Sequence, residues 1–215
     1  MSGLRERKKQ ATREALMTAA LRLALERGLE NVRVEDIAAA AGVSARTYNN
    51  YFASKYEAIT ARHTDRVLGA VTALRARPPG EPFWEAVTEA MVLPWEQHAG
   101  TADAAPPAEL LASIRMLSDE PALRAESLRV AFAADGELAA AVAERSGTNP
   151  ARDLYPHLVA AAVTAAVQAA VGHWLRADPP VPLVPLLRDS LRALAAGLPA
   201  PSGPPSQQGE TSWTS

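Results

Sequence analysis

The sequence contains no cysteine among its 215 residues. This absence excludes disulfide bonds and thiolate metal sites, and it is typical of proteins from a reducing compartment, so we expect a cytoplasmic protein. Runs that alternate Val, Ile or Thr with polar residues are also missing, and such runs would have predicted β-strands. Aromatic residues make up 5% of the chain, whereas alanine supplies much of its 48% hydrophobic content and favours helices. Together these features predict an all-α fold.

Motifs of catalysis and cofactor binding are absent as well. We find no nucleophile elbow, P-loop, dinucleotide-binding glycine pattern or paired zinc-ligand motif. His98, His157 and His173 are too widely spaced for a local metal site, since the last two would lie about 24 Å apart along one helix. We therefore expect neither a cofactor nor a metal. The charged N-terminal residues are not followed by the apolar core of a signal peptide.

The charges are divided unevenly along the chain. Residues 1–62 contain 11 Lys and Arg against 7 Asp and Glu, and the remainder contains 11 basic against 17 acidic residues. A chance scatter of a few charges would explain this difference. A basic N-terminal part and an acidic remainder also suit a protein that meets DNA with one end only.

Residues 34–59, VEDIAAAAGVSARTYNNYFASKYEAI, carry the strongest local signal. Apolar side chains recur at helical spacing from Val34 to Ala41. Gly42 then suits a left-handed cap at the end of a helix, and Ser44 is a good N-cap for the next one. The pattern predicts a helix-turn-helix, whose second helix can lie in the major groove of DNA.

The second helix of this motif has distinct faces. Tyr48 and Phe52 are four residues apart and can both point inward. Arginine matches the O6 and N7 atoms of guanine, and asparagine matches N6 and N7 of adenine. Ser54 can cap the following helix, where Lys55 and the helix N-terminus can together hold a phosphate. The side chains left on the other faces of the second helix are Ala45, Arg46, Asn49 and Asn50.

The segment AGVSARTYNNYFASK resembles the signature of TetR-family transcriptional regulators. The preceding REALMTAALRLALERGLENVRVEDIA resembles the first helix of that family and the entry to its second helix, so the resemblance covers about residues 5–62. It implies an N-terminal three-helix helix-turn-helix DNA-binding domain, joined to a C-terminal helical ligand-binding and dimerisation domain. The implied partners are a double-stranded DNA operator, a second copy of the chain and a small-molecule effector.

The resemblance also implies a set of DNA-binding residues, which includes Arg33 and Ser44. Those that fall where family members touch bases are Ala45, Arg46, Asn49 and Asn50, and those that fall where they touch phosphates are Thr47, Tyr51 and Lys55. Three positions depart from the family pattern. Asn49 replaces a common tyrosine, and Arg33 replaces a threonine that often caps the second helix, so the phosphate contact there is lost or becomes a charged one. Ala24 replaces a frequent phenylalanine, which should thin the core of the small domain.

The rest of the chain is predicted as helices separated by proline-rich turns. We expect a DNA-binding domain over residues 1–53, a regulatory and dimerisation domain over 54–198 and a disordered tail over 199–215. Residues 1–10 should be mobile. The helices that we expect span 10–27, 54–76, 82–98 with a kink or break near Pro94, 108–117, 121–145, 151–177 and 183–196.

Residues 158–175, LVAAAVTAAVQAAVGHWL, form a run without charge. Its length alone would allow a membrane span, but it consists mostly of weakly hydrophobic alanine and contains Thr164, Gln168 and His173. We therefore expect no membrane partner and favour burial, partly against a second copy of the chain. The TetR resemblance implies the same, because the last two helices of that family form a four-helix bundle in a homodimer.

Aromatic and methionine residues are scattered through the second domain. Each one alone is most simply an ordinary core residue, but as a set they allow a mostly apolar pocket between helices. The candidate ligand-binding residues are Trp84, Met91, Trp95, Met116, Phe132, Gln168 and His173. The sequence thus predicts a DNA-binding repressor that a small apolar effector releases from a palindromic operator. Two alternatives stay open: a ligand-independent regulator or activator of the same fold, and a helical enzyme with an incidental helix-turn-helix.

Overall fold

The computed structural model describes residues 2–98 and 105–199, and these contain helices but no strand. The expected tail from residue 200 onward lies outside the described residues. The elements in chain order are α1 (Ser2–Arg27), the 3-10 turn η1 (Leu29–Asn31), α2 (Val34–Ala40), α3 (Ala45–Asn49), α4 (Lys55–Ala76), α5 (Phe83–His98), α6 (Ala108–Asp119), α7 (Pro121–Ser146), α8 (Tyr155–Trp174) and α9 (Leu183–Ala195). The predicted all-α fold is confirmed.

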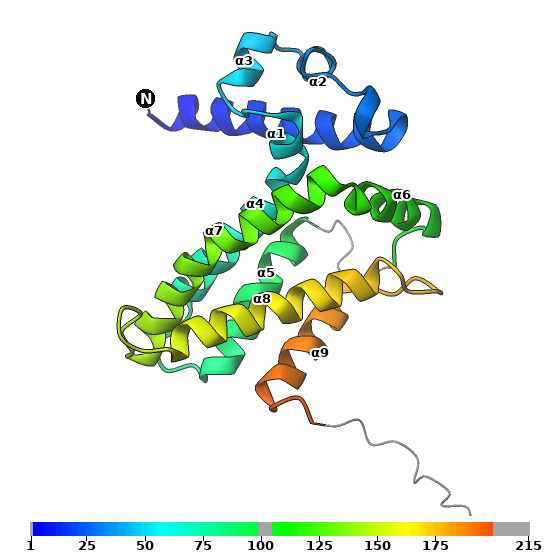
Figure 1. The fold of residues 1–215 in the computed structure, drawn as a ribbon. Helices are drawn as coiled ribbons and strands as arrows, with labels where there is room; N and C mark the ends of the chain where they lie inside the picture. Colours follow the sequence, from blue (N-terminus) through cyan, green and yellow to red (C-terminus); the bar gives the residue numbers. More distant parts are fainter. Residues whose placement is uncertain (1, 99–104, 200–215) are drawn as a thin grey trace, which may run out of the picture.

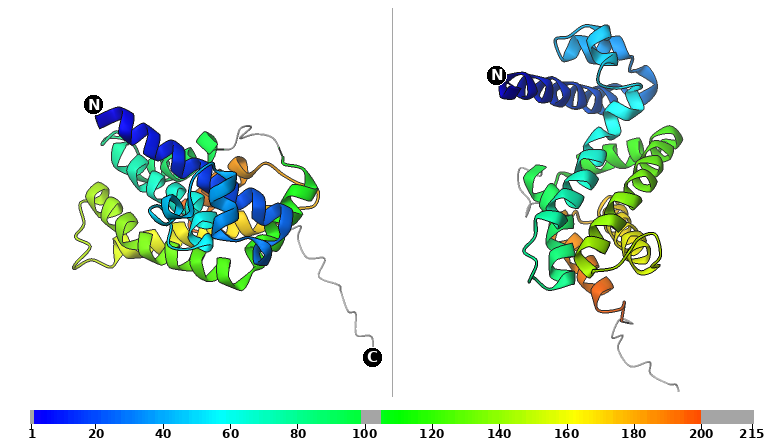
Figure 2. Two further views of the ribbon diagram at one scale, coloured as in Figure 1. Left: turned by 90° about the horizontal axis from the view of Figure 1, so that it is seen from above. Right: turned by 90° about the vertical axis from the view of Figure 1, so that its left-hand side faces the viewer.

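The molecule has two parts, which α4 connects. Figure 1 shows α1, α2 and α3 at one end and the other helices at the opposite end, with α4 running from one to the other. The right-hand view of Figure 2 shows the same separation from the side. We call residues 2–62 the head and residues 63–98 and 105–199 the body.

Each part has its own apolar core. The head core includes Leu16 and Leu23 of α1 and Ile37 of α2, and it also takes Ala58 and Ala61 from the first turns of α4. The body core joins residues of α4, α5, α7, α8 and α9. Because α4 contributes to both cores, a shift of α4 in the body must strain its packing in the head.

A third apolar cluster lies where the head meets the body. It joins Ala24 and Leu29 of the head to Leu117 at the end of α6 and Leu123 in the first turns of α7. Ala24, where a larger side chain was expected, is 3% exposed and lies within this cluster. The small residue thus borders the corner between α6 and α7 as well as the head.

Two predictions about helix ends are wrong. Residues 2–10 are the start of α1 and not a mobile arm, because this segment is rich in Arg and Lys, which favour helices, has no proline, and continues the helix outward from the packed part. α8 begins at Tyr155 and not near residue 151, because Asn149 forms a turn with its carbonyl oxygen accepting from the amides of Arg152 and Asp153.

The sequence predicts a kink or a break near Pro94; the helix does not break, and α5 runs through Pro94 to His98. Gly69 of α4 faces the proline ring, since a Cβ at this glycine would lie 3.4 Å from Pro94 Cγ. The missing side chain therefore lets α4 and α5 approach each other at the proline.

Candidate functional site

The turn between α2 and α3 has the geometry that the sequence predicts. Gly42 has φ +71°, a left-handed conformation that glycine adopts without strain. The amide of Val43 donates to the carbonyl of Ala38 at 2.9 Å, which closes the end of α2. Ser44 then caps α3, because its Oγ accepts from the amide of Thr47 at 3.1 Å. Both predicted caps are confirmed, and they fix the angle at which α3 leaves α2.

Tyr48 anchors α3 to the head. Its side chain is fully buried, its hydroxyl donates to the carbonyl of Ser54 at 2.8 Å, and its ring centroid lies 5.8 Å from that of Phe52. Burial, with a smaller contribution from Glu57, raises the pKa of Tyr48 to about 12. The hydroxyl therefore stays protonated and keeps donating throughout the physiological pH range.

The opposite side of α3 and the turn after it are open to solvent. Arg46, Asn49 and Asn50 are exposed, and Ala45, Thr47 and Tyr51 are half-buried. The structure thus places the predicted base-contacting residues on one accessible end of the head. Ser44 is also exposed, but its Oγ already serves the cap of α3.

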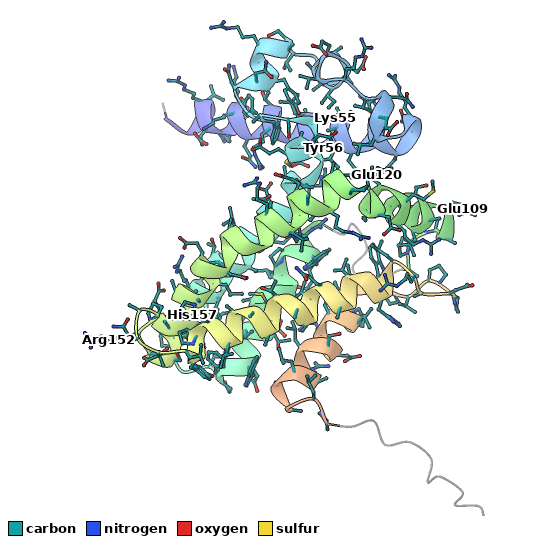
Figure 3. All side chains as sticks on the ribbon, in the orientation of Figure 1. Lys55, Tyr56, Glu109, Glu120, Arg152 and His157 are labelled. Atoms are coloured by element: carbon teal, nitrogen blue, oxygen red, sulfur yellow. The ribbon has the colours of Figure 1, made fainter. Side chains whose placement is uncertain are left out.

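Lys55 has an internal role that the sequence does not reveal. Its Nζ donates to the carbonyl oxygens of Leu29 at 2.8 Å and Val32 at 3.0 Å, so it ties the start of α4 to the segment before α2. Figure 3 labels Lys55 and Tyr56 at this point, just below the head helices. An ammonium has three donors, so one donor remains for the predicted phosphate.

Arg33 occupies the N-cap position of α2. Its backbone amide donates a hydrogen bond to Asp36 Oδ2 at 3.0 Å. Its side chain is exposed and forms no hydrogen bond or ion pair with the described residues. An arginine cannot cap a helix through its side chain, because it has no acceptor. The guanidinium is consequently available for a partner outside the chain.

Ion pairs hold α1 against α4. Arg13 Nη1 lies 2.5 Å from Asp65 Oδ2, and Arg62 Nη2 lies 2.6 Å from Glu14 Oε1. Arg62 also donates to Thr18 Oγ1 at 2.8 Å. These contacts, added to the apolar core of the head, make α1 and the first half of α4 one packed unit.

The body contains a cavity of about 60 Å³ between α4, α5, α7 and α8. Most of its wall is apolar and comes from all four helices, with Val67, Val71, Met91, Leu138, Val163 and Val167. Three of the predicted ligand-binding residues line it, namely Met91, Trp95 and Gln168. A water molecule occupies about 30 Å³ of liquid, so the cavity as it stands holds only a few waters.

The other predicted ligand-binding residues lie elsewhere. Met116 is 74% exposed and does not line this cavity, because α6 buries Leu111 and Leu117 and turns Met116 outward. Trp84 packs edge-on against Phe83, with centroids 5.4 Å apart, and does not line this cavity. His173 is exposed and is not part of the wall either. The side chain of Phe132 lies outside the described residues.

Four polar residues of the cavity wall escaped the sequence analysis: His63, Arg66, Asp135 and Thr164. The Arg66 guanidinium carbon lies 4.1 Å from the centroid of the Trp95 ring, a cation–π contact. Burial lowers the pKa of Arg66 to about 10, with Arg62 adding to the shift, so the group is still charged at neutral pH. Thr164 Oγ1 donates to Asp135 Oδ1 at 3.2 Å.

His63 lies beside Arg66 in the same wall. Burial and then the charge of Arg66 lower the pKa of His63 from its ordinary value of 6.5. The imidazole is therefore neutral at pH 7 and can both donate and accept a hydrogen bond.

α8 has an apolar face that the described residues leave uncovered. Leu158 is 57% exposed, and Ala161, Ala165 and Ala169 continue from it at helical spacing, all exposed. By length and composition alone α8 could cross a membrane, and 28% of its most apolar window is buried inside the chain. One such helix is weak evidence for a membrane span, because a helix from the core of a protein passes the same test.

Comparisons with known proteins follow the division into head and body. Residues 16–60 match the family described as "Bacterial regulatory proteins, tetR family", and residues 81–199 match the "MftR C-terminal domain" of TetR regulators. The chain is also 34% identical over 178 residues to the HTH-type transcriptional regulator TcmR of Streptomyces glaucescens, an alignment that covers 82% of this chain and 79% of TcmR.

Solved structures show the same fold at lower identity. FadR of Thermus thermophilus, a TetR-family repressor solved in complex with lauroyl-CoA, superposes with a TM-score of 0.53 at 20% identity over 89% of this chain and 97% of that one. The fatty acid degradation regulator FadR of Bacillus halodurans gives 0.56 at 20% identity over 87% and 96%. Two matching family patterns that together cover most of the chain, and a relative above 30% identity, agree with the helix-turn-helix geometry: the chain belongs to the TetR family of transcriptional regulators.

Proposed function

We propose that the chain is a homodimeric repressor, and that an effector with a largely apolar body enters the cavity and releases it from a palindromic operator in the cytoplasm. The observation that carries this proposal is the double role of α4. Ala58 and Ala61 of α4 are part of the head core, while Val67 and Val71 line the cavity about two to four turns further along the same helix.

In this proposal α3 reads the operator. Arg46, Asn49 and Asn50 are exposed at the open end of the head and have the donors and acceptors that match guanine and adenine edges, and Ala45 lies beside them. Phosphates are assigned to Thr47, Tyr51, the remaining donor of Lys55 and the unpaired guanidinium of Arg33. Ser44 holds α3 in position through its cap.

The uncovered stripe of α8, together with α9, is the proposed dimer interface. The stripe carries small side chains, which allow two helices to approach closely, and the exposed Leu158 adds apolar area. A two-fold interface here would give the assembly two heads, matched to two half-sites about 34 Å apart. Binding with both heads gains affinity that neither head has alone.

The size of the cavity supports release by a change of shape. Cavities that take drug-sized ligands measure about 300–1,000 Å³, far above the 60 Å³ found here. A ligand of that size must therefore push the surrounding helices apart. Because α4 is tied to α1 by the Arg13–Asp65 and Arg62–Glu14 pairs, its displacement would carry the head with it.

The same small volume also favours a second candidate, a ligand-independent regulator of the same fold. A ligand library and an operator fragment obtained by selection from random DNA distinguish the two. The proposal expects at least one compound to quench tryptophan fluorescence and to weaken operator binding by about 5–150-fold. A chain that binds its operator equally well with every compound would support the ligand-independent candidate.

A further inference from the structure

Arg66 differs from the other arginines with a buried Nε, because its guanidinium forms no hydrogen bond to the described residues. The Nε atoms of Arg62, Arg66 and Arg145 are all buried without a partner in the part of the chain that the structure describes. Arg62 compensates through Nη2, which bonds to Glu14 and Thr18. Arg145 compensates through Nη2 as well, which donates to the carbonyls of Pro78 at 2.8 Å and Glu81 at 2.9 Å. Arg66 has no hydrogen bond and no ion pair to any described residue.

Asp65 and Asp135 form no ion pair with Arg66 in the described part of the chain. Asp65, the preceding residue, pairs with Arg13 at 2.5 Å on the side of the head. Asp135 lines the same cavity, but it accepts from Thr164 and forms no ion pair with Arg66. The guanidinium carbon lies over the face of Trp95, and the charge of Asp65 favours the charged form of Arg66 without a direct ion pair.

This arrangement leaves an incomplete binding geometry. A cation–π contact occupies one face of the guanidinium, but the donors point from its edge in a planar fork that fits a carboxylate. The buried Nε of Arg66 has no hydrogen-bond partner among the described residues, and a buried donor without a partner is unfavourable, so an anion that reaches this edge would satisfy it. The neutral imidazole of His63, in the same wall, can add one more donor to that anion.

Asp135 of α7 lines the same cavity. Asp135 offers an acceptor that Thr164 only partly satisfies, because an ionised carboxylate has about four acceptor positions. Much of the remaining wall is apolar, with Val67, Val163 and Val167. The cavity therefore combines a guanidinium, a carboxylate and aliphatic side chains in its wall.

We propose that the effector is an organic acid: its carboxylate, or a similar planar anion, pairs with Arg66 beside Trp95, and its apolar body lies against the aliphatic side chains of the cavity wall. This inference rests on the proposed function, since it takes the cavity to be the effector site. It adds the chemical class of the ligand and assigns its specificity to a residue of α4, the helix that joins cavity and head.

Matched probes test the charge without knowledge of the natural ligand. The probes are 4-hydroxybenzoate, 4-hydroxyphenylacetate and 3-(4-hydroxyphenyl)propanoate, each beside its primary amide, which has nearly the same shape and no charge. Calorimetric titration of the full-length protein should show at least one acid that binds about 10-fold or more tightly than its amide. Amides that bind as well as their acids, or no acid with a Kd below about 1 mM, would overturn the inference.

Variants assign the effect to Arg66. Arg66→Met should remove the preference for the acid, and Arg66→Lys, which keeps the charge without the fork, should restore part of it. Arg152→Gln is the matched control: it also removes one positive charge, but it lies in the turn before α8, far from the head (Figure 3), and should bind the acid as the natural protein does. Unchanged binding of the acid by Arg66→Met would reject Arg66 as the anchor.

A measurement without any ligand separates binding from structure. If Arg66 is placed for an anion and not for the fold, Arg66→Met should raise Tm by about 2–4 °C in ligand-free buffer. A fall in Tm would show that Arg66 supports the fold and would reject its role as a vacant anchor.

Operator affinity, measured with the same probes, keeps the two proposals apart. An acid that binds through Arg66 but leaves operator affinity unchanged supports the ligand class and contradicts the proposed release. Amides that release the operator as well as acids do support the release and contradict the ligand class.

Discussion

Replacing Lys55 with methionine separates the internal role of this residue from its proposed contact with a phosphate. The structure gives the Nζ atom two hydrogen bonds, to Leu29 O and Val32 O, and both bonds are charge-assisted. Such a bond contributes about 1.5–3 kcal/mol. The side chain is half-buried and water can reach the freed carbonyls in part, so we expect a total loss of about 2 kcal/mol in the free energy of unfolding.

Urea denaturation at a constant m-value measures this loss, and thermal unfolding should show Tm lower by about 4–8 °C for a chain of this length. Lys9→Met, the same exchange at an exposed position of α1, is the control and should change stability by less than about 0.5 kcal/mol. Equal stability of the two variants would refute the reasoning from the two hydrogen bonds.

The salt dependence of operator binding then tests the remaining donor of Lys55. A phosphate contact contributes about 0.9 to the slope of log K against log salt concentration, so Lys55→Met should reduce the slope by about 0.9 for each subunit bound. The slope reports charge contacts and not stability, provided that the variant is folded in the assay. An unchanged slope would leave Lys55 with its internal role alone.

Three further changes address other parts of the molecule. Arg46→Ala should weaken operator binding by about 1–3 kcal/mol and relax the preference at one base position, whereas equal losses on operator and random DNA would rule out base reading. Ala165→Glu should reduce the sedimenting mass from about twice the 22.8 kDa chain to one chain, while Ala125→Glu on the exposed side of α7 should leave it unchanged. The fold favours the neutral form of His63, so the contribution of this residue to the free energy of unfolding is fully present above pH 6.5. As the pH falls below 6.5, the free energy of unfolding decreases by up to about 1.4 kcal/mol for each pH unit. A His63→Gln variant, measured by urea denaturation with Arg66 and Asp135 unchanged, should not show this decrease.

The helix-turn-helix could be predicted in detail because its signals are local. Gly42 and Ser44 fix the turn through a backbone angle and a cap, and both depend only on neighbouring residues. Tyr48 and Phe52 are both buried, as their spacing predicts, although α3 ends at Asn49 and Phe52 lies in the segment after it. Assignment of residues 2–10 failed for the opposite reason, since a charged segment is compatible with both a solvated helix and a mobile arm.

The cavity could be predicted only in part, because its wall depends on packing between four helices. Met91 and Trp95 were found through their side-chain type, but Arg66 lies in the charged stretch of α4 and nothing local shows that α5 buries it. Met116 was predicted to line the pocket, although the pattern of apolar residues around it argues against this position. Leu111, Ile114 and Leu117 recur every three residues, and this period leaves Met116 off the buried face.

Because α4 belongs both to the head and to the cavity wall, operator binding and effector binding affect each other in the proposed mechanism. In the proposed mechanism, operator DNA that holds the heads at the half-site spacing also holds α4 in the position that keeps the cavity small. If effector binding weakens operator binding by a factor within the usual 5–150-fold range, operator binding must weaken effector binding by the same factor, because the two equilibria share one cycle. The protein bound to DNA is then the poorer receptor, and the free dimer captures the effector first. Release would therefore proceed chiefly by trapping dimers that have already dissociated, unless the effector can open the cavity while both heads remain in their grooves.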